Sequence, residues 1–334
     1  MTTNRTVLVI GVTGGVGGEV ARVLAARGWT VRGLARNVSA AQQRWQRPVI
    51  EWAEGDAMNA ADVTAAAKGV GFIFHGANPA GYKNWAGLAM PMLASTIAAA
   101  RANGARIVFP GTVYNYGPDA MPLISETAPQ QPLTKKGRIR VEMEDSLAAA
   151  ARDGVGVIIV RAGDFFGPRT GNSWFGQGIV KPGAEVKAIT YPGRPEIGHA
   201  FAYLPDLAET FAQLMERADA LPAFASFHFG GHYFARGIAI AEALRVAVGK
   251  PNLAIGRFPW WFIYAGSPFV ETFREMVEMH YLWQQNLQLD NSRLVAFLGS
   301  EPHTPTDTAL RTTLEGLGCL PKRDLAAAPL PAGR

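Results

Sequence analysis

Short apolar runs and longer amphipathic stretches alternate along the first 160 or so residues of the chain. Runs rich in β-branched and aromatic residues predict strands, whereas apolar residues spaced three and four apart predict helices. The predicted strands cover 7–10, 30–35, 49–54, 71–75, 106–110 and 155–161, and the predicted helices cover 15–27, 60–68, 86–103 and 135–152. This alternation is typical of a parallel, doubly wound α/β sheet with helices on both faces.

The pattern changes after Gly163, where Pro–Gly pairs interrupt a loop-rich region. Helices are predicted again at 204–217, 238–248 and 269–285, and 201–207 reads as a strand and helix that return to the sheet. We therefore expect a sheet domain at 1–165 and a smaller C-terminal substrate-binding region at 166–325, which partly returns to the sheet near 200–217. Residues 326–334 are expected to form a frayed tail.

The composition of the chain excludes several classes of protein but does not point to one function. The chain has 334 residues, a net charge of +5 and one cysteine, Cys319, which excludes an intrachain disulfide and a cysteine-cluster metal site. Lys and Arg are scattered, so nucleic-acid binding is not expected. The sequence contains neither a signal-peptide pattern nor an apolar run long enough to cross a bilayer, so a cytoplasmic protein without a membrane partner is expected.

A glycine turn links the first strand to the first helix. Gly11, Gly14 and Gly17 keep the spacing of a dinucleotide-binding loop. The first glycine permits a tight turn, the second lets the backbone approach a pyrophosphate, and the third lets the helix pack closely on the sheet. The N-terminus of the helix then directs N–H groups at the phosphates. Together they predict a dinucleotide site in a Rossmann sheet.

Six motifs occur in an order that resembles the extended short-chain dehydrogenase/reductase superfamily, the epimerase/dehydratase-like proteins. They are Gly11–Gly17, Gly55–Asp56, His75–Asn78, Gly111–Gly117, Arg161–Pro168 and Phe201–Ala208. The resemblance implies a nicotinamide cofactor, an NADP-binding domain at 1–165 and a small-molecule substrate. The cofactor contacts that it implies are Gly11, Thr13, Gly14, Gly15, Val16, Gly17, Arg36, Asp56, Ala57, Gly76, Ala77, Asn78, Arg138, Ala162 and Asp164.

The cofactor preference depends on the end of the second strand. NAD-preferring folds usually carry an acidic residue there, which binds the ribose 2′-hydroxyl, but this chain has Arg36. A guanidinium pairs with a 2′-phosphate, so NADP(H) is favoured over NAD(H). Asp56 is expected either to accept a hydrogen bond from the adenine amino group or to cap the next helix.

The catalytic segment departs from the family, whose active members use a Ser or Thr, a Tyr, and a Lys four residues after the Tyr. Thr112 matches the first position, but no Tyr-x-x-x-Lys occurs in the predicted helix. Aligning the Glu of the family motif to Glu142 puts Thr134 and Arg138 at the Tyr and Lys positions. Aligning it to Glu144 puts Lys136 and Arg140 there. The catalytic candidates are Thr112, Tyr116, Lys136 and Arg138, with Tyr114, Lys135 and Asp164 as further possible acids.

The substrate side is expected to be aromatic, because the loop after the sixth strand passes the nicotinamide position. The candidates are Tyr82, Phe165, Phe166, Trp174 and His199. His199 has no partner at metal-ligand spacing, so no metal is expected. The aromatic stretch Trp260–Tyr264 is expected to be a core plug or a pocket lid rather than a membrane anchor.

Three functions follow. The first is an NAD(P)H-dependent oxidoreductase that acts on a carbonyl or alcohol of a small, partly apolar substrate. The second is a nucleotide-sugar epimerase or dehydratase, with Arg169, Lys181, Lys187 and Arg194 as candidate diphosphate contacts. The third is a non-catalytic NADP(H)-binding sensor, which the missing Tyr and Lys favour. The family often dimerises through the helices expected at 86–103 and 135–152, so a homodimer is possible.

Overall fold

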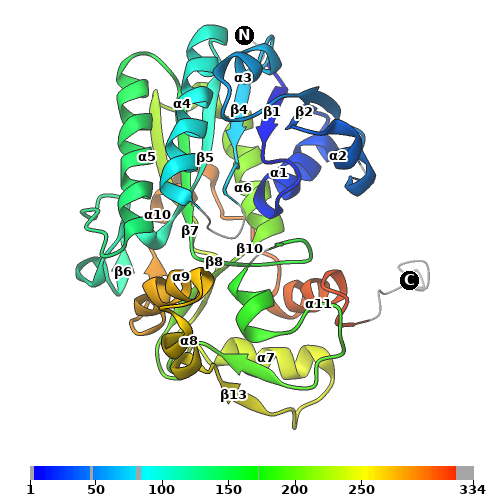
Figure 1. Cartoon of the computed structure of the whole chain (residues 1–334), viewed down its shortest axis with the longest axis vertical. Helices are drawn as coiled ribbons and strands as arrows, with labels where there is room; N and C mark the ends of the chain where they lie inside the picture. The colour runs from blue at the N-terminus through cyan, green and yellow to red at the C-terminus, as the bar shows by residue number, and fades with distance from the viewer. Residues whose placement is uncertain (1–3, 46–47, 80–83, 172, 321–334) are drawn as a thin grey trace, which may run out of the picture.

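The computed structural model describes residues 4–45, 48–79, 84–171 and 173–320. Its centre is a seven-stranded parallel sheet with the strand order β3-β2-β1-β4-β5-β7-β11 (Figure 1). The strands are β1 (Thr6–Ile10), β2 (Thr30–Ala35), β3 (Glu51–Glu54), β4 (Phe72–His75), β5 (Arg106–Thr112), β7 (Val157–Ala162) and β11 (Phe224–His228). The sequence-based expectation of a doubly wound parallel Rossmann sheet is confirmed.

Helices cover both faces of the sheet, which explains why its inner strands, such as β1 and β7, are largely apolar. Val7 and Val9 pack with α1 (Gly15–Ala26) and α6 (Leu204–Glu216) on one face. Leu8 and Ile10 pack with α3 (Ala60–Ala66), α4 (Trp85–Asn103) and α5 (Lys135–Arg152) on the other. A short helix that the pattern did not predict, α2 (Val38–Arg44), follows β2 and is capped by the Asn37 side chain.

The strand expected near residue 201 does not join the central sheet. It is β10 (His199–Tyr203), which pairs with β8 (Asp164–Phe166) and β12 (His232–Phe234) in a three-stranded sheet. The helix after it, α6, does return and packs against α1. The strand that extends the central sheet is β11, which the sequence pattern did not predict.

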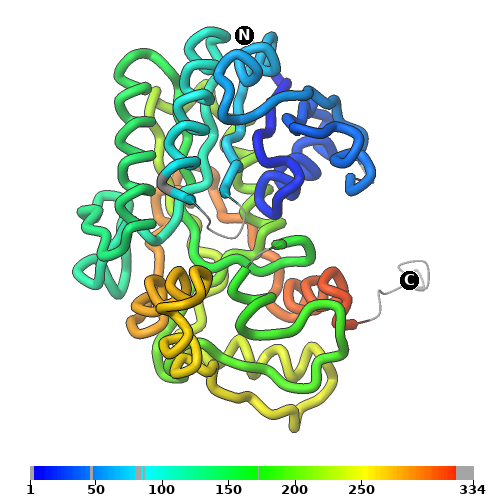
Figure 2. Tube along the Cα trace, viewed as in Figure 1, coloured from blue at the N-terminus to red at the C-terminus, as the bar shows by residue number. Residues whose placement is uncertain are grey.

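The remaining elements form the lower part of the molecule in Figures 1 and 2. They include α7 (Ala239–Val248), α8 (Trp260–Gly266), α9 (Glu271–Met279), α11 (Thr306–Gly316) and the two-stranded sheet of β9 (Ile189–Tyr191) and β13 (Ile255–Arg257). The pairing of β6 (Leu123–Ile124) with β14 (Gln288–Leu289) connects this part to the loop after β5, and α10 (Ser292–Leu298) packs beside β11. The helix expected at 269–285 is shorter, because α9 gives way to a 3-10 turn at 280–283. Residues 321–334 lie outside the described residues.

Candidate functional site

The motif residues meet where the central strands end. All seven strands are parallel, so their carboxyl ends share one edge of the sheet. Ile10 pairs with His75 between β1 and β4, and Thr112 pairs with the buried Ala162 between β5 and β7. The glycine turn, Gly76 and Asp164 therefore follow the strands at this edge, where ligands of doubly wound sheets bind.

Steric contacts require glycine at two positions of the turn. Gly11 has a φ of +85°, and a Cβ atom there would lie 2.5 Å from the carbonyl oxygen of Gly76. A Cβ atom on Gly17 would lie 2.5 Å from the carbonyl oxygen of Gly11. Gly14, which precedes α1, donates its N–H to Gly11 O at 2.9 Å and provides no side-chain cap.

The first N–H groups of α1 therefore remain for an anion, and the exposed Thr13 and the half-buried Val16 flank them. The turn thus fits the pyrophosphate of a dinucleotide.

A loop far along the chain lies against this turn. A Cβ atom on Gly15 would overlap the carbonyl oxygen of Thr170, so the backbones approach closely here. Arg169 beside it donates two hydrogen bonds, of 2.8 and 2.6 Å, to the buried carboxylate of Glu19 on α1. The segment after β8 is therefore fixed to the first turns of α1.

The adenine side of the expected site lies beyond β2 and β3. Arg36 is exposed at the end of β2, and no carboxylate among the described residues pairs with it. Asp56 is half-buried, as is its neighbour Ala57; its N–H donates to Asp62, and its carboxylate accepts from the N–H of Met58 at 2.9 Å. Asp56 therefore organises its own loop, while Asn59 provides the cap of α3.

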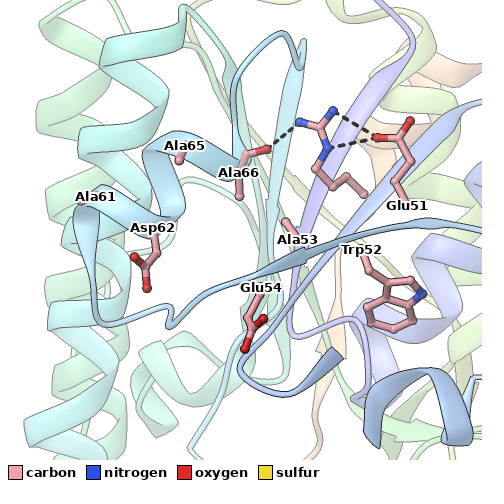
Figure 3. Close-up of a pocket in the computed structure, with 9 residues that line it drawn as sticks. Glu51, Trp52, Ala53, Glu54, Ala61, Asp62, Ala65 and Ala66 are labelled. Carbon is pink, nitrogen blue, oxygen red and sulfur yellow. Dashed lines mark hydrogen bonds and ion pairs between the residues drawn. The ribbon is translucent and has the colours of Figure 1, made fainter. Parts of the chain in front are cut away.

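A groove borders this side at the edge of the sheet, between β3 and α3 (Figure 3). Its charged groups are largely engaged: Arg32 donates to Glu51 and to the carbonyl oxygen of Ala66, and Asp62 accepts from the Asp56 loop. The groove does not include the glycine turn, and its side chains offer no cationic group that remains available for a phosphate.

The end of β4 closes the other side of the turn. Gly76 donates its N–H to Ile10 O at 2.9 Å, Ala77 packs on the core, and Asn78 accepts a 2.6 Å hydrogen bond from the Trp85 indole. His75 is buried and lies 2.7 Å from the Thr96 hydroxyl. Burial, reinforced by the charge of Arg140, lowers the pKa of His75 to about 3, so this imidazole is neutral. The candidate Tyr82 lies outside the described residues.

The register of α5 is settled by an ion pair inside the protein. Glu144 is buried and accepts hydrogen bonds of 3.1, 3.1 and 2.5 Å from Arg161 on β7. Residues four apart share a helix face, so Lys136 and Arg140 lie on the same side as Glu144. Arg138 and Glu142 are exposed, and Thr134 caps the helix by accepting from Gly137 N–H at 2.9 Å. The alignment to Glu144 is therefore the one that faces the sheet.

Lys136 is held by α9. Its ammonium is buried and lies 2.5 Å from the Glu275 carboxylate and 3.0 Å from the Glu275 carbonyl oxygen. The Glu278 carboxylate lies 3.8 Å from the same ammonium. It also accepts hydrogen bonds from the backbone N–H groups of Lys135 and Lys136 at the start of α5. Lys136 thus joins the sheet domain to the C-terminal region. The sequence contains no local signal for this contact, because its partners lie about 140 residues away.

Arg140 occupies the next turn. Its guanidinium lies 5.1 Å from the Trp85 ring centroid and 5.4 Å from that of Phe109, and it donates to Pro110 O at 3.4 Å. Arg140 therefore sits beside the end of β5, where the resemblance would place the Lys. Arg138 points elsewhere and donates only to Leu133 O among the described residues.

Thr112 and Tyr116 have different surroundings. The Thr112 hydroxyl accepts from Tyr114 N–H at 3.3 Å and donates to the Asn115 amide oxygen at 3.4 Å, at the end of β5. Tyr116 is completely buried and lies 3.1 Å from Nε2 of His228, whose Nδ1 is 3.0 Å from Ile124 O. Burial raises the pKa of Tyr116 to about 12 and lowers that of His228 to about 3. Tyr116 thus donates to a neutral histidine in the core, and it is poorly placed to act as an acid.

Asp164 and His199 form a buried pair. The carboxylate lies 2.7 Å from Nε2 of His199, and the imidazole stacks on Trp283 with centroids 4.1 Å apart. Trp283, 84 residues after His199, was not among the residues chosen from sequence.

The two adjacent phenylalanines point to opposite cores. Phe165 packs on the sheet side, while Phe166 is buried against Phe175 and Tyr203. Trp174 contacts Trp260, Phe258 and Trp283 with centroids 5.6–5.9 Å apart. Phe166 and Trp174 thus pack with the aromatic core of the C-terminal region.

Two kinds of feature are absent from the part of the chain that the structure describes. It contains no group of three or more His, Cys, Asp or Glu side chains arranged to hold a metal ion. Among the same residues, no helix has the length and apolar character needed to cross a membrane.

Known proteins share this fold. The structure is similar to that of a UDP-galactose 4-epimerase, with a TM-score of 0.69 and 18% identity over 93% of this chain and 98% of that chain. It is also similar to UDP-N-acetylglucosamine 4-epimerase from Bacillus cereus, with a TM-score of 0.68 and 16% identity over 92% of this chain and 94% of that chain. A third similar structure is UDP-glucose 4-epimerase from Bifidobacterium longum in complex with NAD+ and UDP, with a TM-score of 0.69 and 16% identity over 94% of this chain and 97% of that chain. No curated protein sequence matches the chain. The model of the family described as "NAD dependent epimerase/dehydratase family" matches residues 7–230, about two thirds of the chain. The chain belongs to the NAD-dependent epimerase/dehydratase family.

Proposed function

We propose that the chain is an oxidoreductase that uses a nicotinamide dinucleotide to reduce a carbonyl or oxidise an alcohol. The observation that carries this proposal is the glycine turn, in which Gly11 and Gly17 leave no room for a side chain and the N-terminus of α1 has no side-chain cap. Similar structures from Bifidobacterium longum and Bordetella bronchiseptica are described in complex with NAD+, which supports the same cofactor class here.

The cofactor that we favour is NADP(H). Arg36 is exposed at the end of β2 without a carboxylate partner among the described residues, so it is available for a 2′-phosphate. The test is titration of the protein with NADPH, NADP+, NADH and NAD+ by calorimetry. Arg36→Ala should weaken NADPH binding about 10- to 100-fold and leave NADH binding unchanged, because a hydrogen bond to a charged group contributes about 1.5–3 kcal/mol.

Arg44→Ala, which removes another exposed arginine nearby on α2, is the control and should retain NADPH affinity. Equal affinity of the wild type for NADH and NADPH would contradict the preference.

Two side chains are assigned to the chemistry. When bound, the nicotinamide supplies or accepts the hydride. The Thr112 hydroxyl donates to Asn115 and accepts from Tyr114, so it can accept one further hydrogen bond, from a substrate hydroxyl. The alignment to Glu144 puts Lys136 at the family's Tyr position, and on that alignment we assign it the exchange of a proton with the substrate oxygen, with Glu275 beside it.

The substrate that we propose is small and partly apolar, because the segment after β8 carries an aromatic cluster that includes Phe166, Trp174 and Trp283. Of the four cations considered for a diphosphate, Arg169 binds Glu19, Arg194 binds Glu196, and Lys181 and Lys187 are exposed. Nucleotide-sugar epimerisation remains the second candidate, since three of the similar solved structures are UDP-sugar epimerases and the family is described as one of epimerases and dehydratases.

A substrate panel separates the candidates. Oxidation of NADPH is followed with small aliphatic and aromatic aldehydes and ketones, and interconversion of UDP-glucose and UDP-galactose is followed in parallel. Turnover of the carbonyls alone supports the oxidoreductase, whereas sugar interconversion supports the epimerase. Tight cofactor binding without turnover on either arm would contradict both and support the non-catalytic sensor.

A further inference from the structure

The most unusual surface feature of the protein is a set of exposed aromatic side chains on and after α8. Trp261 is 75% exposed and Phe269 88%, and Phe262, Tyr264 and Val270 are also exposed; we call these five side chains the aromatic patch. They account for five of the eleven exposed large hydrophobic side chains among the described residues, although they lie within ten residues of sequence. The expectation of a core plug at 260–264 is wrong for Trp261, Phe262 and Tyr264.

The patch is part of an ordered helix and not a consequence of poor packing. Trp260 turns inward, donates its indole N–H to Pro192 O at 2.7 Å and stacks on His280 with centroids 3.8 Å apart. Ile263, one turn further, is buried. The helix is thus anchored by one side, on which Tyr264 also lies 2.8 Å from Nδ1 of His280, and Trp261 and Phe262 project from the rest of its surface. Trp261 and Phe262 contact one another with ring centroids 5.9 Å apart, and exposed apolar side chains gathered in this way typically mark an interaction site.

A cationic groove adjoins the aromatic patch. It lies between the start of α5 and α9, has a volume of about 630 Å³, and shares Tyr264 with the patch. Lys135, Arg138 and Arg274 line it, and no carboxylate of the described residues forms an ion pair with any of the three. The two acidic residues of the groove are already used, since Glu275 and Glu278 bind Lys136 and the N-terminal N–H groups of α5.

Charge and shape together indicate the partner. Arg257, three residues before α8 in the sequence, is a further exposed cation, and Glu271 is the exposed carboxylate of the segment 255–280. Side chains that are 75–88% exposed project from the surface, so a protein partner would need matching pockets, whereas the interfacial layer of a bilayer accepts Trp, Tyr and Phe rings without them. Adjacent Lys and Arg side chains bind anionic headgroups.

We propose that the aromatic patch and the cationic groove bind the surface of a membrane that contains anionic lipids. The chain attaches to one leaflet by α8 and the turn before α9, while the sheet lies in the upper part of the molecule in Figure 1, away from α8. This inference is independent of the proposed function and replaces the expectation that no membrane is involved.

The test is sedimentation of the full chain with vesicles of phosphatidylcholine, with and without phosphatidylglycerol. The wild type should bind the anionic vesicles, more weakly as salt is raised. Trp261→Ser with Phe269→Ser should reduce binding at least about tenfold. Lys135→Gln with Arg274→Gln should reduce binding to the anionic vesicles specifically. The controls are Val246→Ser, which removes a 76% exposed side chain from α7, and Arg44→Gln with Lys68→Gln, and both should bind as the wild type does.

Three results would overturn the proposal. They are absence of wild-type binding to anionic vesicles, unchanged binding of the Trp261→Ser/Phe269→Ser variant, and an equal loss in the Val246→Ser control. The alternative is that the patch joins two copies of the chain, which sedimentation velocity without lipid tests. A protein that does not bind vesicles, and that forms a dimer which the aromatic substitutions dissociate, would show this alternative to be right. All the substituted side chains are exposed, and an unchanged circular dichroism spectrum confirms that the variants fold.

Discussion

Glu144 on α5 and Arg161 on β7 form a buried ion pair in which one carboxylate accepts three hydrogen bonds from one guanidinium. The pair fixes the rotation of α5 relative to the sheet. Glu144→Gln leaves the Arg161 charge buried without a counterion, so it should lower the free energy of unfolding by about 3–5 kcal/mol. Glu142→Gln, on the exposed face of the same helix, should change it by less than about 0.5 kcal/mol. Urea denaturation followed by circular dichroism measures both, and equal effects would contradict this account.

The rotation of α5 that the Glu144–Arg161 pair fixes also predicts which arginine of this helix contributes to cofactor binding. Arg140 lies beside the end of β5, whereas Arg138 is exposed. Arg140→Ala should weaken NADPH binding about 10- to 100-fold, and Arg138→Ala should leave it within about twofold of the wild type. The opposite ranking, measured by calorimetry, would favour the alignment of α5 to Glu142.

Lys136 has two possible contributions, which two substitutions separate. Lys136→Arg keeps a cation for Glu275 and Glu278 but cannot exchange a proton near neutral pH, whereas Lys136→Met removes both. If Lys136 moves a proton, both variants should lose kcat by about 10²-fold or more. Lys135→Met, next to it and exposed, should keep full activity. Retained activity in Lys136→Arg would reduce the role of Lys136 to holding α9 in place.

Gly15 predicts a coupling between the glycine turn and the loop after β8. Gly15→Ala must displace Thr170 and with it the Arg169–Glu19 contact. The overpacking should cost about 1–3 kcal/mol of stability and raise the Kd for NADPH. Gly256→Ala is the matched control, because its Cβ would meet only ordinary contacts at 3.9 Å. An unaltered melting temperature in Gly15→Ala would show that the loop does not rest on the turn.

Two buried histidines predict that acid destabilises the fold. His75 and His228 have pKa values lowered to about 3, against about 6.5 in the unfolded chain, so the unfolded state binds more protons between these values. Stability should therefore be fully present above about pH 6.5 and should fall by about 1.4 kcal/mol per pH unit for each histidine as pH drops toward 3.

Urea denaturation between about pH 4 and 7 measures the slope. His228→Gln should make the slope of stability against pH shallower by about 1.4 kcal/mol per pH unit. An identical slope in His228→Gln would show that His228 titrates normally.

The sheet could be predicted from sequence because its strands are buried on both faces. Runs such as 7–10 and 155–160 are continuously apolar, and Gly11 and Gly17 mark the turn by a steric need that only glycine meets. β11 escaped prediction because the short run 224–228 is interrupted by Ser226 and ends in His228, and it gains its place only by pairing with β7.

The candidate site was less predictable because its decisive contacts join distant segments. The alternatives at α5 could be written down from sequence, but choosing between them needed the partner of Glu144, which lies on another strand. The same holds for Lys136 with Glu275 and for Asp164 with His199. Tyr116 matched a motif and yet lies in the core, because the hydrogen-bonding capacity of its hydroxyl is satisfied by His228.

The position of β11 at the edge of the sheet constrains how the chain can be made. On the ribosome, β7 leaves the exit tunnel before its outer neighbour exists, and the face later covered by α6 is still bare. The nascent chain therefore exposes an unpaired strand edge and an apolar face until residue 228 has emerged, a state prone to association with other chains. Synthesis that stops near residue 165 would leave the central sheet without β11 and α6, even though the whole glycine turn had already been translated.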